Sequence, residues 1–424
     1  MREQMSARSP HSPLRCILSG VVGLLLGGVA ATPAHAESVR EKQWHLSAMK
    51  AEQMWRTSTG EGVTVSVIDT GVDDEIADLR GRVLPGKDMA PAEPGDARTD
   101  YEGHGTSMAL LIAGAGKGSR GNGTLGLAPG AKILPIRLPD YGLDANRHTK
   151  ASNEEFSRGI RVAADSGAKI INISMGTIKG SEQLTAAVKY ALGKGALVFA
   201  STGNEGTSAL RYPAATPGVA AVGAVGKDLR KTKESQYGPQ VDVAAPGDEI
   251  FTACPNGKGG PCEGHGTSAA TALASASAAL IWSKHPDWTN NQVLRVMLNT
   301  IGAPTDGAKR NDSIGYGIVR PRVALQNPGD PGPPDEYPLP DLKQSRSSSS
   351  SSSPSPSRSA AATPDDEGSP AAAPETADSG GAGAGATAWI VTGVGAAALI
   401  GGAVAALAVR KRRAAGSVHL TGRQ

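Results

Sequence analysis

Three Gly-rich segments of the sequence carry an aspartate, a histidine and a serine that could act together in catalysis. Asp69 lies in Val-Ile-Asp-Thr-Gly-Val, His104 in Gly-His-Gly-Thr-Ser-Met-Ala and Ser268 in Gly-His-Gly-Thr-Ser-Ala-Ala. A serine hydroxyl is a weak nucleophile until a histidine takes its proton, and a buried carboxylate orients that histidine and stabilises its charged form. We therefore predict a serine hydrolase with Ser268 as nucleophile, His104 as general base and acid, and Asp69 as the orienting carboxylate.

A fourth Gly-rich segment could stabilise the oxyanion that forms when the serine attacks a carbonyl group. Asn204 lies in Gly-Asn-Glu-Gly, directly after an apolar run that is typical of a buried strand. Its side-chain amide could donate one hydrogen bond to the oxyanion, and the backbone N–H of Ser268, at the start of a helix, could donate a second. We predict Asn204 as a member of the oxyanion hole.

The elements that must position these residues follow an alternating pattern between about residues 43 and 326. Short β-branched runs alternate with helix-like stretches, which is typical of an α/β fold with a mostly parallel sheet and helices on both faces. Such a sheet gathers functional groups at the carboxyl ends of its strands. The predicted strands are Val63–Ile68, Lys132–Arg137, Ile170–Ser174, Leu197–Ala200 and Ala220–Val225, and the predicted helices include Ser152–Ser166 and Ser181–Lys194.

The flanking segments predict an exported and anchored protein. Residues 1–36 have the charge, apolar run and Ala-x-Ala ending of a signal peptide, ahead of a peptidase domain at 37–327. Residues 328–386 are rich in Pro, Ser and Gly and predict a disordered linker. Residues 387–409 predict a single transmembrane helix, because about 23 apolar residues span about 34 Å. The basic tail at 410–424 should be cytoplasmic, which leaves the domain extracytoplasmic on the cell membrane.

Charge and cysteine content limit the remaining possibilities. The formal net charge of the 424-residue chain is only +3, so no nucleic-acid partner is indicated. Of the three cysteines, Cys16 lies in the leader, and the other two, Cys254 and Cys262, are expected to form a disulfide in an exported chain. Two free thiols or a shared metal are the alternatives, although no further ligand is spaced for zinc. We predict no cofactor and no metal site, and calcium binding stays an open question, although no dense acidic loop is present.

These segments resemble the subtilisin family of serine proteases over roughly residues 43 to 326. The resemblance extends to Asn172-Ile173-Ser174-Met175-Gly176, and it implies that Ser174, Met175 and Gly176 form the backbone edge that pairs with an extended peptide substrate. The signal, linker and span resemble the mycosins, which are membrane-anchored proteases associated with type VII secretion. This implies an endopeptidase that cleaves peptides or proteins and has the type VII secretion machinery as a partner.

Three departures and two rival functions complete the prediction. Ala272 stands where the family usually has proline, His265 is an unusual neighbour of the nucleophile, and the stretch from Ala36 to Asp69 is too short for a long inhibitory pro-domain. Ser107, in the first Gly-His-Gly-Thr-Ser copy, is interpreted as structural.

The first rival function is that of a subtilisin-fold scaffold that stabilises a secretion complex with little essential proteolysis. The second is an esterase or peptide ligase with the same nucleophile.

Overall fold

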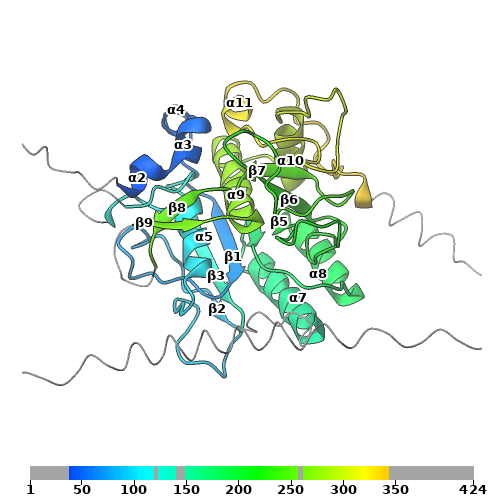
Figure 1. Ribbon diagram of the computed structural model, residues 1–424. Helices are drawn as coiled ribbons and strands as arrows, with labels where there is room; N and C mark the ends of the chain where they lie inside the picture. Colours follow the sequence, from blue (N-terminus) through cyan, green and yellow to red (C-terminus); the bar gives the residue numbers. More distant parts are fainter. Residues whose placement is uncertain (1–37, 119–122, 140–148, 256–260, 343–424) are drawn as a thin grey trace, which may run out of the picture. The chain divides into compact units, whose positions relative to one another are not determined.

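A parallel sheet organises the part of the chain that the computed structural model describes, which is residues 38–118, 123–139, 149–255 and 261–342 (Figure 1). Within these ranges, seven strands pair in the order β2-β3-β1-β4-β5-β6-β7, and every pairing is parallel. The strands are β1 (Thr64–Asp69), β2 (Lys87–Asp88), β3 (Lys132–Arg137), β4 (Ile170–Ile173), β5 (Leu197–Ser201), β6 (Ala220–Val225) and β7 (Val243–Pro246).

Helices cover both faces of the sheet, and alternate strand residues pack against each layer. On one face, Val65 and Val67 of β1 join a core with the buried faces of α5 and α9. On the other, Ile68 of β1 joins a second core with α7 and α8. The four helices are α5 (His104–Ala113), α7 (Thr149–Asp165), α8 (Glu182–Gly193) and α9 (Thr267–Lys284). Burial on both faces explains why the central strands are mostly apolar.

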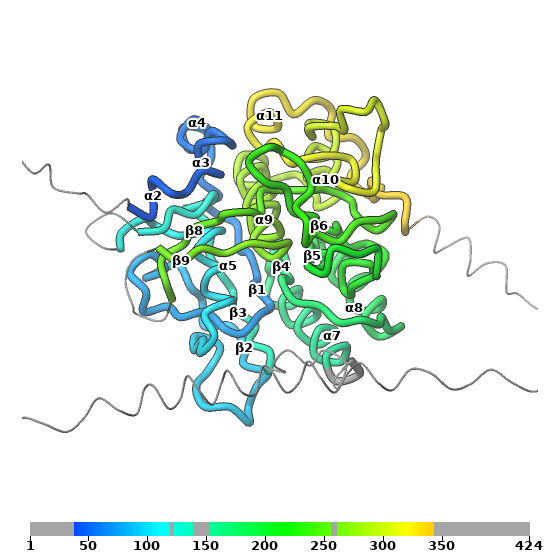
Figure 2. Tube along the Cα trace, viewed as in Figure 1, coloured from blue at the N-terminus to red at the C-terminus, as the bar shows by residue number. Residues whose placement is uncertain are grey.

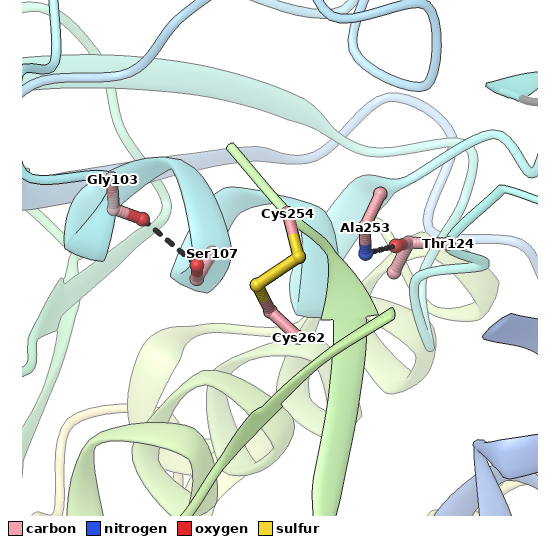
Figure 3. Close-up of a disulfide and its surroundings, with 6 residues drawn as sticks. All are labelled: Gly103, Ser107, Thr124, Ala253, Cys254 and Cys262. Carbon is pink, nitrogen blue, oxygen red and sulfur yellow. Dashed lines mark hydrogen bonds between the residues drawn. A yellow bond between two sulfur atoms is a disulfide. The ribbon is translucent and has the colours of Figure 1, made fainter. Parts of the chain in front are cut away.

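An antiparallel hairpin leads directly into α9. Strands β8 (Ile250–Ala253) and β9 (Pro261–Gly264) pair with each other, and the predicted disulfide between Cys254 and Cys262 closes them, with an S–S distance of 2.03 Å. The hairpin contacts α5, and Figure 3 shows the disulfide beside the first turns of that helix. The disulfide therefore holds the segment that enters α9 close to the helix that begins at His104.

The remaining helices are short and lie outside the two layers that cover the sheet. Helix α4, near the start of the domain, contacts α11, a helix from its C-terminal part (Figure 2). These smaller helices are α2 (Val39–Lys42), α3 (Trp44–Ala48), α4 (Ala51–Trp55), α10 (Asn290–Asn299) and α11 (Pro321–Gln326). Across the described ranges, no helix combines the length and apolar character needed to cross a membrane.

The predicted strands are confirmed to within one or two residues, and both named helices are present. The sequence reading did not identify β7 or the hairpin, because their short runs contain Pro, Gly or polar residues. The predicted span at 387–409, the signal peptide, the tail and most of the linker lie outside the described residues.

The packed chain continues past residue 327, the predicted end of the peptidase domain, to residue 342. Leu339 is only 1% exposed. The Tyr337 hydroxyl donates to the Gly218 carbonyl at 2.9 Å, and the Gly218 N–H donates to the Asp341 carboxylate at 2.5 Å. Proline-rich composition suggested a linker, but proline also lowers the entropy lost on ordering, so a few well-placed side chains are enough to hold this segment.

Candidate active site

The predicted aspartate and histidine meet at the carboxyl end of the sheet. Asp69 is the last residue of β1 and is fully buried, and His104 is the first residue of α5. The two atoms that join them, His104 Nδ1 and Asp69 Oδ1, are 2.6 Å apart. Gly105 makes this approach possible, because a Cβ there would lie 2.1 Å from the Gly71 carbonyl oxygen. The first turn of α5 can therefore pack directly on the end of β1.

The environment of His104 favours its protonated form. Burial by itself lowers the pKa of the imidazole, but the charge and hydrogen bond of Asp69, with the charges of Asp100 and Glu102, raise that pKa to about 9. The imidazole is 36% exposed, whereas Asp69 is inaccessible to solvent. The raised pKa therefore favours an imidazolium paired with a buried carboxylate at neutral pH, and the neutral form that can accept a proton gains as the pH rises toward about 9.

Asp100 was missed by sequence reasoning, and it connects the two elements that hold the pair. One carboxylate oxygen accepts from the Thr70 hydroxyl at 2.9 Å and from the Gly103 N–H at 2.8 Å. The other accepts from the Thr106 N–H at 2.8 Å and from its hydroxyl at 2.6 Å. Asp100 thus ties the residue after Asp69 to the N-terminus of α5, where a negative charge is also favourable. The signal in the sequence that could have identified Asp100 is its position four residues before His104.

The predicted nucleophile lies in the first turn of the neighbouring helix. Ser268 is the second residue of α9, which packs against α5 on the same face of the sheet. Its hydroxyl donates to the Ser174 carbonyl oxygen at 2.9 Å, rather than to His104. The structure therefore joins Asp69 to His104 directly and places Ser268 beside the residues predicted to bind substrate. Since hydrogen bonds of catalytic groups often form only when substrate is bound, this arrangement is compatible with the predicted role.

Asn204 is fixed beside the nucleophile by its amide oxygen. That oxygen accepts from the Thr267 N–H at 2.8 Å and from the Thr267 hydroxyl at 2.9 Å. The amide nitrogen lies against Gly266, where a Cβ would come within 2.8 Å of it and where φ is +111°. Glycine is therefore required at this position. Because the contacts with Thr267 use the amide oxygen of Asn204, the N–H groups of the Asn204 amide are available to donate next to Ser268.

The three residues predicted to bind a peptide follow β4 directly. Ser174 is buried, Met175 is half-buried and Gly176 is exposed. Beyond them, Thr177 and Tyr212 form an antiparallel bridge through hydrogen bonds of 2.8 and 2.9 Å. Within the described residues, no main-chain hydrogen bond involves Met175 or Gly176. The geometry is therefore that of an open main-chain edge beside Ser268, which suits pairing with an extended peptide.

Other polar residues near the site have structural contacts. The Ser107 hydroxyl donates to the Gly103 carbonyl at 2.8 Å within its own helix (Figure 3). His265 is 72% exposed, and its Nδ1 lies 3.7 Å from a Glu234 oxygen. Ala272 is buried within α9, which continues through this position without the usual proline. Among the described residues, no group of three His, Cys, Asp or Glu side chains is arranged to hold a metal ion.

Comparisons with known proteins agree with this geometry. Residues 60–317 match the model of the Subtilase family. Subtilisin BL of Lederbergia lenta is 33% identical over 284 residues, which cover 67% of this chain and 98% of that protein. Thermitase of Thermoactinomyces vulgaris is 35% identical over 243 residues, covering 57% of this chain and 83% of that protein.

Solved structures of secretion-associated proteases are also similar. MycP1 from Mycobacterium smegmatis has a TM-score of 0.61 and 28% identity, with 73% of this chain and 90% of that chain covered. MycP3, a protease from the type VII (ESX-3) secretion system, has a TM-score of 0.58 and 32% identity, with 70% and 90% covered.

The contacts of Asp100 predict that Asp100→Ala lowers both stability and reactivity. Four hydrogen-bond donors lose their acceptor, so we expect the free energy of unfolding to fall by about 1–3 kcal/mol. Displacement of His104 should slow labelling of Ser268 by a fluorophosphonate on the order of 100-fold. Ser107→Ala is the matched control in the same helical turn and should change neither quantity appreciably. Equal labelling rates for the two variants would contradict this role.

The raised pKa of His104 predicts an alkaline pH dependence. The labelling rate of Ser268 should rise about tenfold per pH unit below pH 9 and level off above it, because only the neutral imidazole accepts the serine proton. Since the charge of Glu102 contributes to the raised pKa, Glu102→Gln should move the midpoint to lower pH. A rate that does not change between pH 6 and pH 9 would show that His104 is not the titrating base.

Proposed function

Because the chain belongs to the subtilase family of serine endopeptidases, we propose that it cleaves peptide bonds through an acyl-enzyme formed on Ser268. The observation that carries the assignment is the 2.6 Å contact between His104 and the buried Asp69, at the start of a helix that packs beside the helix bearing Ser268. Only long-range folding brings these three residues of the sequence to one edge of the sheet.

The proposed reaction follows from the positions of these groups. His104, held by Asp69 through Nδ1, uses Nε2 to take the proton of the Ser268 hydroxyl as its oxygen attacks the peptide carbonyl carbon. The oxyanion accepts hydrogen bonds from the Asn204 amide and from the Ser268 N–H. His104 then protonates the leaving amine, and the C–N bond breaks to give the acyl-enzyme. Water, deprotonated by His104, hydrolyses the ester and restores the serine.

The proposed substrate is an extended peptide segment of a protein. Its main chain would pair with the edge formed by Ser174, Met175 and Gly176, so that affinity comes from backbone hydrogen bonds and specificity from side-chain pockets. A peptide N–H that donates to the Ser174 carbonyl would compete with the Ser268 hydroxyl for that acceptor. Substrate binding would thereby free the hydroxyl to turn toward His104.

We further propose that the protease is anchored in the cell membrane and acts on a protein exported by a type VII system. The apolar segment 387–409, followed by Arg410-Lys411-Arg412-Arg413, supports a span with the protease domain outside. The likeness to MycP1 and MycP3 supports the link to secretion. Deletion of residues 387–409 should move the protein from the membrane fraction to the soluble exported fraction. Retention in the membrane fraction would contradict the anchor.

A scaffold role is the second candidate, and one observation favours it. The Ser268 hydroxyl donates to the Ser174 carbonyl rather than to His104, and the pKa of His104 is raised to about 9, which lowers the fraction of base form at neutral pH. A protein used mainly to stabilise a secretion complex would tolerate such a state. Under this alternative, a Ser268→Ala strain would secrete normally, whereas deletion of the whole protein would abolish secretion.

Labelling of the full chain with a fluorophosphonate tests the protease assignment. We expect wild type and Ser107→Ala to be labelled and Ser268→Ala to remain unlabelled, because only Ser268 lies beside Asn204 and Ser174. The proteins that react with the probe are then incubated, without the probe, with exported proteins. Mass spectrometry should detect cleaved peptide bonds. Ester turnover without peptide cleavage would favour an esterase or ligase. A folded wild type without labelling would overturn the proposal and favour the scaffold.

A further inference from the structure

A chain of buried hydrogen bonds connects β4 to the nucleophile helix. The Ser275 hydroxyl of α9 donates to the Asn172 amide oxygen at 3.0 Å, and the Asn172 amide nitrogen donates to the Ser174 hydroxyl oxygen at 3.1 Å. The Ser174 hydroxyl in turn donates to the Ser268 main-chain carbonyl at 3.0 Å. All the donors point in one direction along this chain, which ends on the main chain of the nucleophile.

The contrast with other hydroxyls of α9 indicates what Ser275 does. Ser277 and Thr271 are buried in the same helix, and each donates to a carbonyl one turn earlier, at 2.7 Å in both cases. Ser275 is equally buried but donates outside its helix, to a strand residue. A buried polar group costs stability unless it is paired. The Ser275–Asn172 contact therefore satisfies two buried groups only when α9 has one particular position on β4.

The two attachment points lie two helical turns apart. Ser268 and Ser275 are seven residues apart and share a face of the helix. Sliding or rotation of α9 would break both the contact between Ser174 and the Ser268 carbonyl and the contact between Ser275 and Asn172. Nucleophilic attack needs the serine oxygen to be placed within a fraction of an ångström, and an error of about 1 Å costs on the order of 100-fold in rate.

We propose that Ser275 is a positioning residue for catalysis, which fixes the Ser268 main chain through Asn172 and Ser174. The inference rests on the proposed function of Ser268 as nucleophile. Ser174 then has two separate tasks. Its hydroxyl holds the Ser268 carbonyl, while its own carbonyl accepts the Ser268 hydroxyl until a peptide displaces it. The Ser268 hydroxyl can therefore turn toward His104 while the main chain of Ser268 stays in place.

Ser275→Ala in the full chain tests this role, with Ser277→Ala as the matched control. We expect Ser275→Ala to lower kcat for a cleaved peptide and the fluorophosphonate labelling rate together, on the order of 10-fold. KM should stay within about twofold because the peptide-binding edge is intact, and the midpoint of the pH profile should not move because His104 and Asp69 are untouched. Ser277→Ala should keep the wild-type rate within about twofold, and Ser275→Thr, which retains the hydroxyl, should recover most of the loss.

A double-mutant cycle separates positioning from general loss of packing. If Ser275 acts through Ser174, Ser174→Ala should slow labelling to a similar extent, and the double variant should be no slower than the slower single variant. Should Ser275→Ala fail to fold, Ser174→Ala decides alone: slower labelling supports the network, and an unchanged rate overturns it. Equal rates for Ser275→Ala and Ser277→Ala, or multiplying losses in the double variant, would overturn the positioning role alone. An unlabelled wild type would overturn the proposed function as well.

Discussion

The burial of a carboxylate at the end of β1 is the constraint on which the site depends. Asp69 has no solvent exposure, and its charge is stabilised by His104 at 2.6 Å and by the Thr70 N–H at 2.9 Å. An unpaired charge in such a position would be strongly destabilising, so the histidine must be held where it can compensate. Gly105 allows α5 to approach β1, and Asp100 ties the first turn of α5 to Thr70. The local fold and the electrostatics of the pair therefore depend on each other.

The helix that bears the nucleophile is positioned by other contacts than the helix that bears His104. Helix α5 is held to the sheet at its N-terminus by carboxylates, whereas α9 is buried along most of its length, rich in alanine and serine, and without a strongly amphipathic face. Such small side chains do little to fix the position of the helix along its axis, because they pack adequately in several registers. The hydrogen bonds of Ser275, Asn172 and Ser174 supply directional contacts, and Asn204 with Thr267 supplies others at the helix start.

Two features oppose transfer of the serine proton to His104. The protonated form of His104, which its raised pKa favours, has no lone pair on Nε2, and the serine hydroxyl has the Ser174 carbonyl as its acceptor. In the proposed mechanism, a peptide N–H that donates to the Ser174 carbonyl takes the acceptor of the Ser268 hydroxyl. Peptide binding and release of the hydroxyl would then be coupled through a single carbonyl group. The disulfide closes the hairpin that precedes Ser268, and this hairpin contacts α5.

The sequence by itself determined the features that depend on local pattern. The apolar runs placed β1, β3, β4, β5 and β6, because strands buried on both faces are mostly apolar, and the Gly-rich segments marked the residues at their ends. Export signals predicted the disulfide. Tertiary structure alone decided the direction of the Ser268 hydroxyl, the tie through Asp100 and the register set by Ser275, since each depends on an acceptor or donor from a distant segment. It also decided that residues 328–342 belong to the domain, because a Pro-rich segment reveals its packing only when Tyr337 and Leu339 meet a surface that fits them.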